Sequence, residues 1–172
     1  MDCLIFSILI ICCTVASTYP YPWHASCSLK WEIPDLTCDI VSDKILEQID
    51  AWNMQHGDDL CRRGTVGTNE VHEKCLYRLI SRTTSQIKAT HETPIKRYVD
   101  TLTFTLTPDG KGCNVDGFST SNTWYAILDY GTNYCNLHNL ADGSGLLQSS
   151  GFVETTSDNK CTQFSSSDCD RY

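Results

Sequence analysis

The clearest pattern in the chain is an alternation of apolar and hydroxyl side chains within residues 98–107. Leu102, Phe104 and Leu106 occupy one set of positions, and threonines occupy the positions between them. Successive side chains of a strand point to opposite faces, so this pattern predicts a strand with an apolar inner face and a hydrated outer face. The Pro108-Asp109-Gly110 sequence then predicts a turn, because proline fixes φ and glycine tolerates positive φ.

Shorter segments elsewhere have the composition of strands or of irregular chain. β-Branched and aromatic residues between turn-forming residues favour strands over 75–81, 86–91, 115–118 and 152–156. Residues 18–36 are rich in proline and aromatic residues, which predicts an extended, irregular lead held by Cys27.

A helical period begins at Asp39. Four apolar residues follow at spacings that place them on one side of a helix: Val41, Ile45, Ile49 and Trp52. A helix of this length is only marginally stable by itself, so we expect its apolar stripe to pack on the sheet.

Residues 122–140 are the stretch around which we expect the fold to be arranged. Residues 123–130 are aromatic and β-branched, Gly131, Thr132 and Asn133 favour a turn, and 134–140 mix polar and apolar residues. The pattern predicts a β-hairpin near the centre of an antiparallel sheet. Because residues 124–128 are all apolar, both faces of that arm must be covered, as in a sheet curled into a barrel with a helix outside.

The two ends of the sequence indicate export and a single domain. Residues 1–17 contain a short apolar run followed by the small residues Val15-Ala16-Ser17, which is typical of a cleaved secretory signal. The run is too short to span a bilayer. Residues 18–172 are long enough for one domain, which we expect to be soluble and extracellular.

Eleven cysteines are present, and three of them lie in the predicted signal. The even remainder predicts four structural disulfides among these residues: Cys27, Cys38, Cys61, Cys75, Cys113, Cys135, Cys161 and Cys169. Their spacings do not fit zinc ligands, so we expect no metal. The formal net charge of −8 disfavours nucleic acid and anionic membranes as partners, because both select clustered Lys and Arg.

The order of elements resembles that of divergent secreted lipocalins, particularly the salivary lipocalins of blood-feeding arthropods. Three short segments carry the resemblance: Lys74–Leu79, Leu128–Cys135, and Cys161–Phe164 together with Cys169. The resemblance implies a lipocalin-like barrel with an N-terminal helix, and it implies the pairings Cys75–Cys169 and Cys135–Cys161. The G-x-W signature of ordinary lipocalins is absent. A cystatin-like α+β fold, in which a sheet wraps one helix, is the alternative, although the cystatin Q-x-V-x-G hairpin is also absent.

No segment of the sequence indicates catalysis. There is no G-x-S-x-G motif, no helical histidine pair and no glycine loop placed before a helix to hold phosphate. We therefore expect a non-enzymatic protein without a cofactor.

A small closed barrel can enclose one small ligand, so the sequence favours a secreted protein that sequesters a hydrophobic or amine ligand. The residues expected to line its cavity are Tyr98, Leu102, Phe104, Leu106, Trp124 and Tyr134. This hypothesis requires a hollow behind Phe104. The alternative is a disulfide-stapled module that binds an extracellular protein, such as a protease inhibitor, a toxin-like factor or a matrix component.

Asp100 has the same strand parity as Leu102 and Phe104, so it is a candidate ligand contact. If Asp100 points inward, its carboxylate is buried and needs a partner. A cationic amine is one such partner, with Trp124 or Tyr98 adding cation–π attraction. The alternative is that Asp100 lies at the open end of the strand, hydrated or bonded to Lys96 or Arg97.

Overall fold

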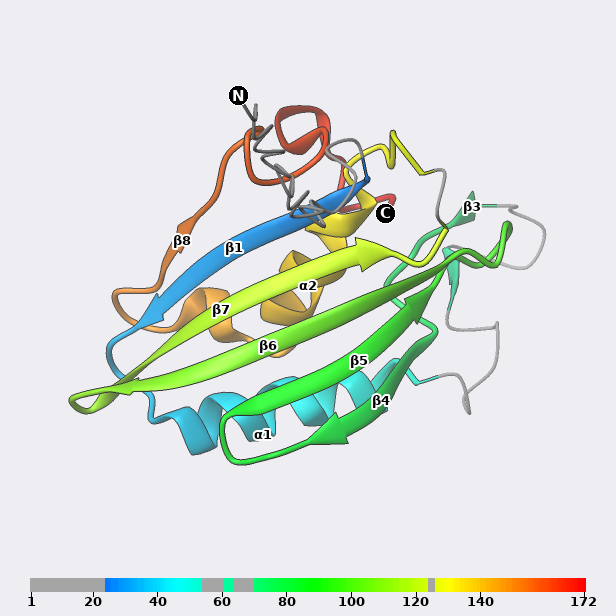
Figure 1. The fold of residues 1–172 in the computed structure, drawn as a ribbon. Coiled ribbons are helices and arrows are strands. Elements are labelled where there is room, and N and C mark those ends of the chain that lie inside the picture. Colours follow the sequence, from blue (N-terminus) through cyan, green and yellow to red (C-terminus); the bar gives the residue numbers. More distant parts are fainter. Residues whose placement is uncertain (1–23, 54–60, 64–69, 124–125) are drawn as a thin grey trace, which may run out of the picture.

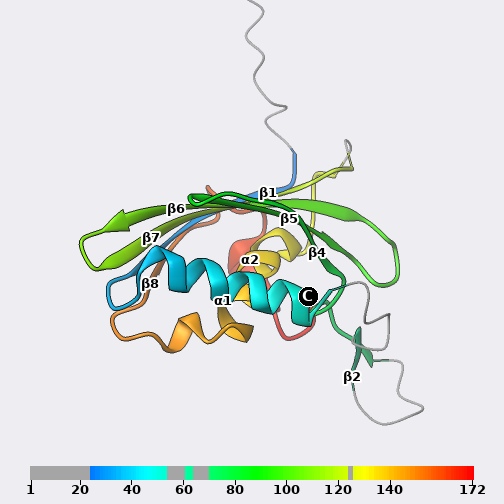
Figure 2. The same ribbon diagram turned by 90° about the horizontal axis from the view of Figure 1, so that it is seen from below.

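The computed structural model describes residues 24–53, 61–63, 70–123 and 126–172. Six antiparallel strands form one sheet, and two helices cover one of its faces (Figures 1 and 2). In spatial order the strands are β4 (Tyr77–Arg82), β5 (Gln86–Glu92), β6 (Val99–Asp109), β7 (Gly112–Ser121), β1 (Ser26–Ile33) and β8 (Val153–Thr155). The helices are α1 (Cys38–Ala51) and α2 (Thr132–Gly143). A separate two-stranded ribbon joins β2 (Arg62–Arg63) and β3 (Glu70–Val71).

The sheet is antiparallel, as predicted, but it is not closed into a barrel. β4 pairs with β5 and β8 pairs with β1, so these two strands form separate edges. Figure 2 shows both helices beneath the same face of the curved sheet. Because the helices bury the inner face of the sheet, closure is not needed to remove that face from water. The expected lipocalin-like barrel is not confirmed, and the second helix departs from the single helix of a cystatin-like fold.

The alternation in β6 is confirmed. Leu102, Phe104 and Leu106 are buried, whereas the threonines between them lie on the face away from the helices. Phe104 stacks on Trp31 of β1 with ring centroids 5.6 Å apart, and neither side chain has exposed surface. The hollow predicted behind Phe104 is therefore filled by aromatic core, so the prediction of a ligand cavity inside a barrel is wrong.

The predicted helix is also confirmed. α1 begins at Cys38, and its residues Val41, Ile45 and Ile49 are buried. Trp52 follows directly and packs on Tyr77 of β4, with centroids 5.8 Å apart. The apolar stripe thus docks the helix on the sheet.

The predicted hairpin over 122–140 is wrong, because the second arm is helix α2. Tyr134, Leu137 and Leu140 recur every three residues and are buried, which is a helical period. The carboxylate of Asp129 accepts hydrogen bonds from the backbone N–H groups of Gly131 and Asn133, both at 3.1 Å. These bonds satisfy N–H groups that the first turn of a helix leaves free. Trp124 and Tyr125 of the first arm lie outside the described residues.

The irregular lead predicted for residues 18–36 is wrong over its second half. β1 lies between β7 and β8, and Cys27, Leu29, Trp31 and Ile33 alternate inward. The short strand predicted at 115–118 is extended to residues 112–121, because it pairs with β1 along one side and with β6 along the other. Residues 1–17, the predicted signal, lie outside the described residues.

All eight predicted cysteines form disulfides, which confirms the stapled framework. The pairs are Cys27–Cys161, Cys38–Cys113, Cys61–Cys75 and Cys135–Cys169. Both pairings implied by the lipocalin resemblance are wrong. Cys135 lies on α2 and faces the C-terminal segment rather than a barrel wall, whereas Cys161 lies beside Cys27 of β1. Within the described ranges, neither helix has the length and apolar composition needed to cross a bilayer.

Candidate ligand-binding cleft

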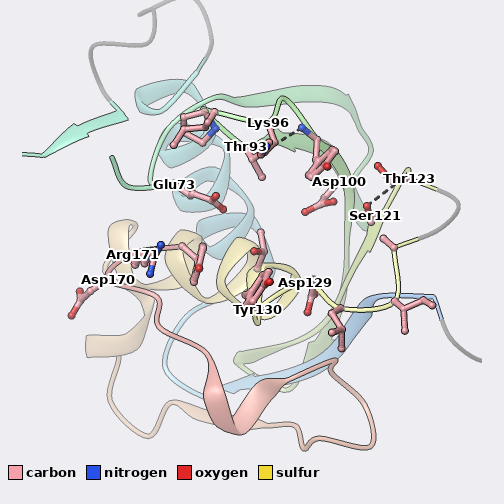
Figure 3. A pocket seen from close by; sticks show the side chains of 18 residues that line it. Glu73, Thr93, Lys96, Asp100, Ser121, Thr123, Asp129, Tyr130, Asp170 and Arg171 are labelled. Atoms are coloured by element: carbon pink, nitrogen blue, oxygen red, sulfur yellow. Dashed lines mark hydrogen bonds between the residues drawn. The ribbon is translucent and has the colours of Figure 1, made fainter. Parts of the chain in front are cut away.

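A cleft of about 1070 Å³ lies at one end of the sheet, where β6 begins and β7 ends (Figure 3). Three segments and one isolated side chain form its walls. The segments are the β5–β6 loop with the start of β6 (Thr93–Asp100), the end of β7 with its connection to the first residue of α2 (Ser121–Thr132, of which 124–125 are not described), and Asp170–Tyr172. The isolated side chain is Glu73, which precedes β4.

Asp100 provides a buried carboxyl group in this cleft. Only 4% of the residue is exposed, and its side chain projects inward from β6 as the strand parity predicts. Asn136 of α2 donates a hydrogen bond of 2.8 Å to Oδ2. Burial raises the pKa of Asp100, whereas hydrogen bonding from Asn136 and Ser121 lowers it. The hydrated arrangement with Lys96 or Arg97 is not observed, since Arg97 instead binds Glu92 at 2.8 Å.

A chain of buried hydrogen bonds holds Asp100 and α2 together. The Nδ2 group of Asn136 lies 3.4 Å from Ser119 Oγ, and that hydroxyl donates to Asn133 Oδ1 at 2.7 Å. Asn133 Nδ2 then donates to Asp129 Oδ2 at 2.8 Å. Because buried networks with satisfied members are rigid, the two carboxylates at its ends have fixed positions in the cleft.

Glu73 is a second carboxyl group that faces the cleft, and it lies near Asp100 in Figure 3. Its Oε2 atom is buried and has no hydrogen-bond partner among the residues that the structure describes. Burial, and secondly the negative charge of Asp100, raise the pKa of Glu73 to about 7, while Arg171 acts in the opposite direction. At neutral pH the carboxyl pair therefore keeps a proton for part of the time.

The walls around these carboxyl groups are largely apolar and aromatic. Ile127, Leu128 and Tyr130 of the β7–α2 connection line the cleft and are 59%, 64% and 64% exposed. Ile95 and Tyr98 of the β5–β6 loop line the facing side and are 74% and 45% exposed. We call these five residues the apolar rim.

The C-terminal segment forms a third wall, and a disulfide holds it. Cys169 is bonded to Cys135 of α2, and Asn139 Nδ2 donates to the carbonyl oxygen of Tyr172 at 2.7 Å. The Tyr172 ring stacks on Tyr130 with centroids 6.3 Å apart. Arg171 lies 5.1 Å from the Tyr172 ring and brings one of the two basic side chains of the cleft, the other being Lys96.

The structure separates the predicted ligand contacts into three groups. Tyr98 and Asp100 line the cleft. Leu102, Phe104 and Leu106 belong to the core beneath the helices, because they lie farther along β6. Tyr134 is on α2, where its hydroxyl donates to Glu154 Oε1 at 2.8 Å and lies 3.0 Å from His138. Trp124 is outside the described residues.

Most cleft residues were not predicted as ligand contacts, and Glu73, Tyr130 and Arg171 are three of them. Glu73 lies in an irregular segment, so no period marks its orientation. Arg171 and Tyr130 come together through the Cys135–Cys169 pairing, which the sequence alone leaves open. Their contribution to the site could be found only from the fold.

Among the described residues, no group of three or more His, Cys, Asp or Glu side chains is arranged to hold a metal ion. The chemistry that the cleft presents is thus two buried carboxyl groups within an apolar and aromatic enclosure. The chain matches no protein-family model, no curated protein and no solved structure.

Proposed function

We propose that this chain is an extracellular protein that binds a small amine with an apolar body in the cleft and does not transform it. The observation that carries the proposal is the buried carboxyl group of Asp100 within apolar walls. Burying a carboxylate in such surroundings costs free energy, and a cationic ligand offsets that cost.

The dimensions and the walls of the cleft support the same class of ligand. Its volume of about 1070 Å³ is at the upper end of the range for small-molecule sites. The rings of Tyr98 and Tyr130 can attract a cation by cation–π interaction, and the aliphatic rim residues can cover the apolar part of the ligand. Four acidic residues line the cleft against two basic ones: Glu73, Asp100, Asp129 and Asp170 against Lys96 and Arg171.

The proposal is tested by calorimetric titration of the oxidised mature protein with 2-phenylethylamine and with its neutral analogue 2-phenylethanol. We expect the amine to bind more tightly. Asp100→Asn should weaken amine binding by about tenfold or more, since it removes a buried charge partner, and should change binding of the alcohol little. Asp116→Asn is the matched control, because Asp116 is exposed on the outer face of β7. Equal binding of the two compounds, or an equal loss in both variants, would contradict the proposal.

A second candidate function is binding of an extracellular protein at the apolar rim. Its support is that Ile95, Ile127 and Leu128 are 74%, 59% and 64% exposed, more than a small ligand inside the cleft would cover. Single Ile95→Ser and Leu128→Ser variants separate the two functions. If the apolar rim binds a protein, we expect both variants to keep an affinity for 2-phenylethylamine within about threefold of the wild type. The protein partner would contact the solvent-facing side of the rim and not the inside of the cleft.

A further inference from the structure

We infer that the amine bound in this cleft carries N–H groups, that one of them donates to Glu73 Oε2, and that a proton leaves the Glu73–Asp100 pair as the amine binds. This inference rests on the proposed function and narrows its ligand to ammonium ions that keep at least one N–H, which are the primary, secondary and tertiary ones. Quaternary ammonium ions are excluded as good ligands.

Glu73 has a carboxyl oxygen that lacks a hydrogen-bond partner among the described residues. The Glu73 side chain lines the cleft, and the oxygen concerned, Oε2, is buried without a donor in that part of the chain. An unmet buried carboxyl oxygen costs more than an ordinary hydrogen bond gains, so a ligand that supplies an N–H recovers that free energy. A quaternary ammonium ion brings charge but no N–H, and it leaves Oε2 unmet.

Several charged and titratable groups surround Glu73 and Asp100. Figure 3 shows Glu73 and Asp100 extending from opposite sides of the cleft toward the same open space, with Arg171 on the side of Glu73. The other charged and titratable groups around the pair are His24 before β1, Asp129 before α2, Lys96 of the β5–β6 loop, Tyr77 of β4, and Asp170 and Arg171 of the C-terminal segment. His91 of β5 accompanies them as a neutral imidazole, because burial lowers its pKa to about 4.

The surrounding charges keep the Glu73–Asp100 pair partly protonated near neutral pH, and a bound cation would cause that proton to dissociate. Asp100 disfavours ionisation of Glu73, and Arg171 compensates for only part of that effect, so the pKa of Glu73 rises to about 7. An ammonium ion between the carboxyl groups favours ionisation of both. The protonated Glu73 carboxyl group loses its proton to the buffer, its carboxylate accepts an N–H of the ligand, and the ammonium ion keeps its own charge and protons.

The experiment compares 2-phenylethylamine with trimethyl(2-phenylethyl)ammonium by calorimetry, at about pH 6, 7 and 8, in two buffers whose ionisation enthalpies differ. With a Glu73 pKa of about 7, we expect release of about half a proton for each primary amine bound at neutral pH. The affinity for the amine should fall about tenfold from pH 8 to pH 6, since only the ionised fraction of Glu73 is competent. The primary amine should bind about tenfold more tightly than the quaternary ion, which is the value of one hydrogen bond to a charged group.

Glu73→Gln is the decisive variant. It should abolish proton release and most of the preference for the primary amine, while Asp100 still gives measurable binding. Glu32→Gln is the control, because Glu32 is exposed on β1. Equal affinities for the two cations, the same heat in both buffers, or an unchanged Glu73→Gln variant would overturn the inference and leave the proposed amine binding standing. An amine that binds no better than 2-phenylethanol would instead remove the proposed function, and the inference with it.

Discussion

At the residue scale, two buried titratable groups have opposite effects on stability as pH changes. The pKa of Glu73 is raised from 4.5 to about 7, so its stabilising effect is complete below pH 4.5 and is lost as pH rises through 7. The pKa of His91 is lowered from 6.5 to about 4, so its stabilising effect is complete above pH 6.5 and is lost as pH falls toward 4. Between pH 4.5 and 6.5, the contributions of Glu73 and His91 to the free energy of unfolding therefore change in opposite directions with pH.

This opposition predicts the pH profile of Glu73→Gln. The variant should be as stable as the wild type at acidic pH and more stable above neutral pH, by up to about 3 kcal/mol, because glutamine has no proton to lose. Its stability should also fall visibly between pH 6.5 and 4.5, since the titration of His91 is no longer offset. Urea unfolding at several pH values measures both effects. A constant difference between the variant and the wild type across pH would contradict the assigned ionisation of Glu73.

Residue patterns gave an inward orientation of Asp100 as one of two possibilities and did not identify its partners. Strand parity with Leu102 placed the carboxyl group inward, and that part is observed. Asn136 came from a segment that we predicted as a strand, and the side chain of Glu73 came from a segment without any period. A site assembled from four chain segments depends on long-range packing, which local patterns do not encode.

At the scale of elements, α2 was not predicted from the sequence, and its start is held in a conformation that favours glycine. Gly131 precedes α2 with φ at +82°, and a Cβ placed there would lie 2.8 Å from Ser167 Cα. Local composition favoured a strand because aromatic residues crowd both sides of Gly131. The helix is stabilised instead by the hydrogen bonds that Asp129 accepts at its start and by the contact of this region with residues 163–167.

The start of α2 gives a prediction with a matched control. Gly131→Ala combines positive φ with a backbone clash, so we expect it to lower the free energy of unfolding by about 2–4 kcal/mol. Gly110→Ala has a similar φ of +60° but no atom within 4 Å of the added Cβ, so it should cost only about 1 kcal/mol. Chemical denaturation of both variants checks the difference. Equal losses would show that Gly131 is needed only for its backbone angle.

The other elements could be predicted to the extent that they repeat a period. α1, β5 and β6 lie where the sequence placed them, because their apolar residues recur every three to four or every two positions. β1 was missed although Cys27, Leu29, Trp31 and Ile33 alternate, because the prolines nearby favoured an irregular segment.

At the scale of the whole molecule, four disulfides join an open sheet to its helices and its C-terminal segment. Three of the four link residues far apart in sequence, with separations of 134, 75 and 34 residues. Closing long loops restricts the unfolded chain most, so the framework should contribute several kcal/mol of stability.

The disulfide framework and the predicted signal together predict the chemical state of the protein when it is produced through a secretory pathway. Purified from a eukaryotic secretory host, the chain should begin at Thr18, contain no free thiol, and have a mass about 8 Da below that of its reduced form. Intact mass spectrometry before and after reduction measures all three properties. Retention of residues 1–17, or several reactive thiols in folded protein, would contradict export and the stapled framework.

The Cys135–Cys169 disulfide makes the attachment of one cleft wall dependent on the redox conditions around the protein. This bond tethers the segment that carries Arg171 and Tyr172. The other contacts of Tyr172 are non-covalent, namely the hydrogen bond from Asn139, the stacking on Tyr130 and packing on the core. In a reducing compartment only these contacts would hold the wall against α2. Under the proposed function, reduction of this bond would therefore speed the release of a bound amine at constant pH.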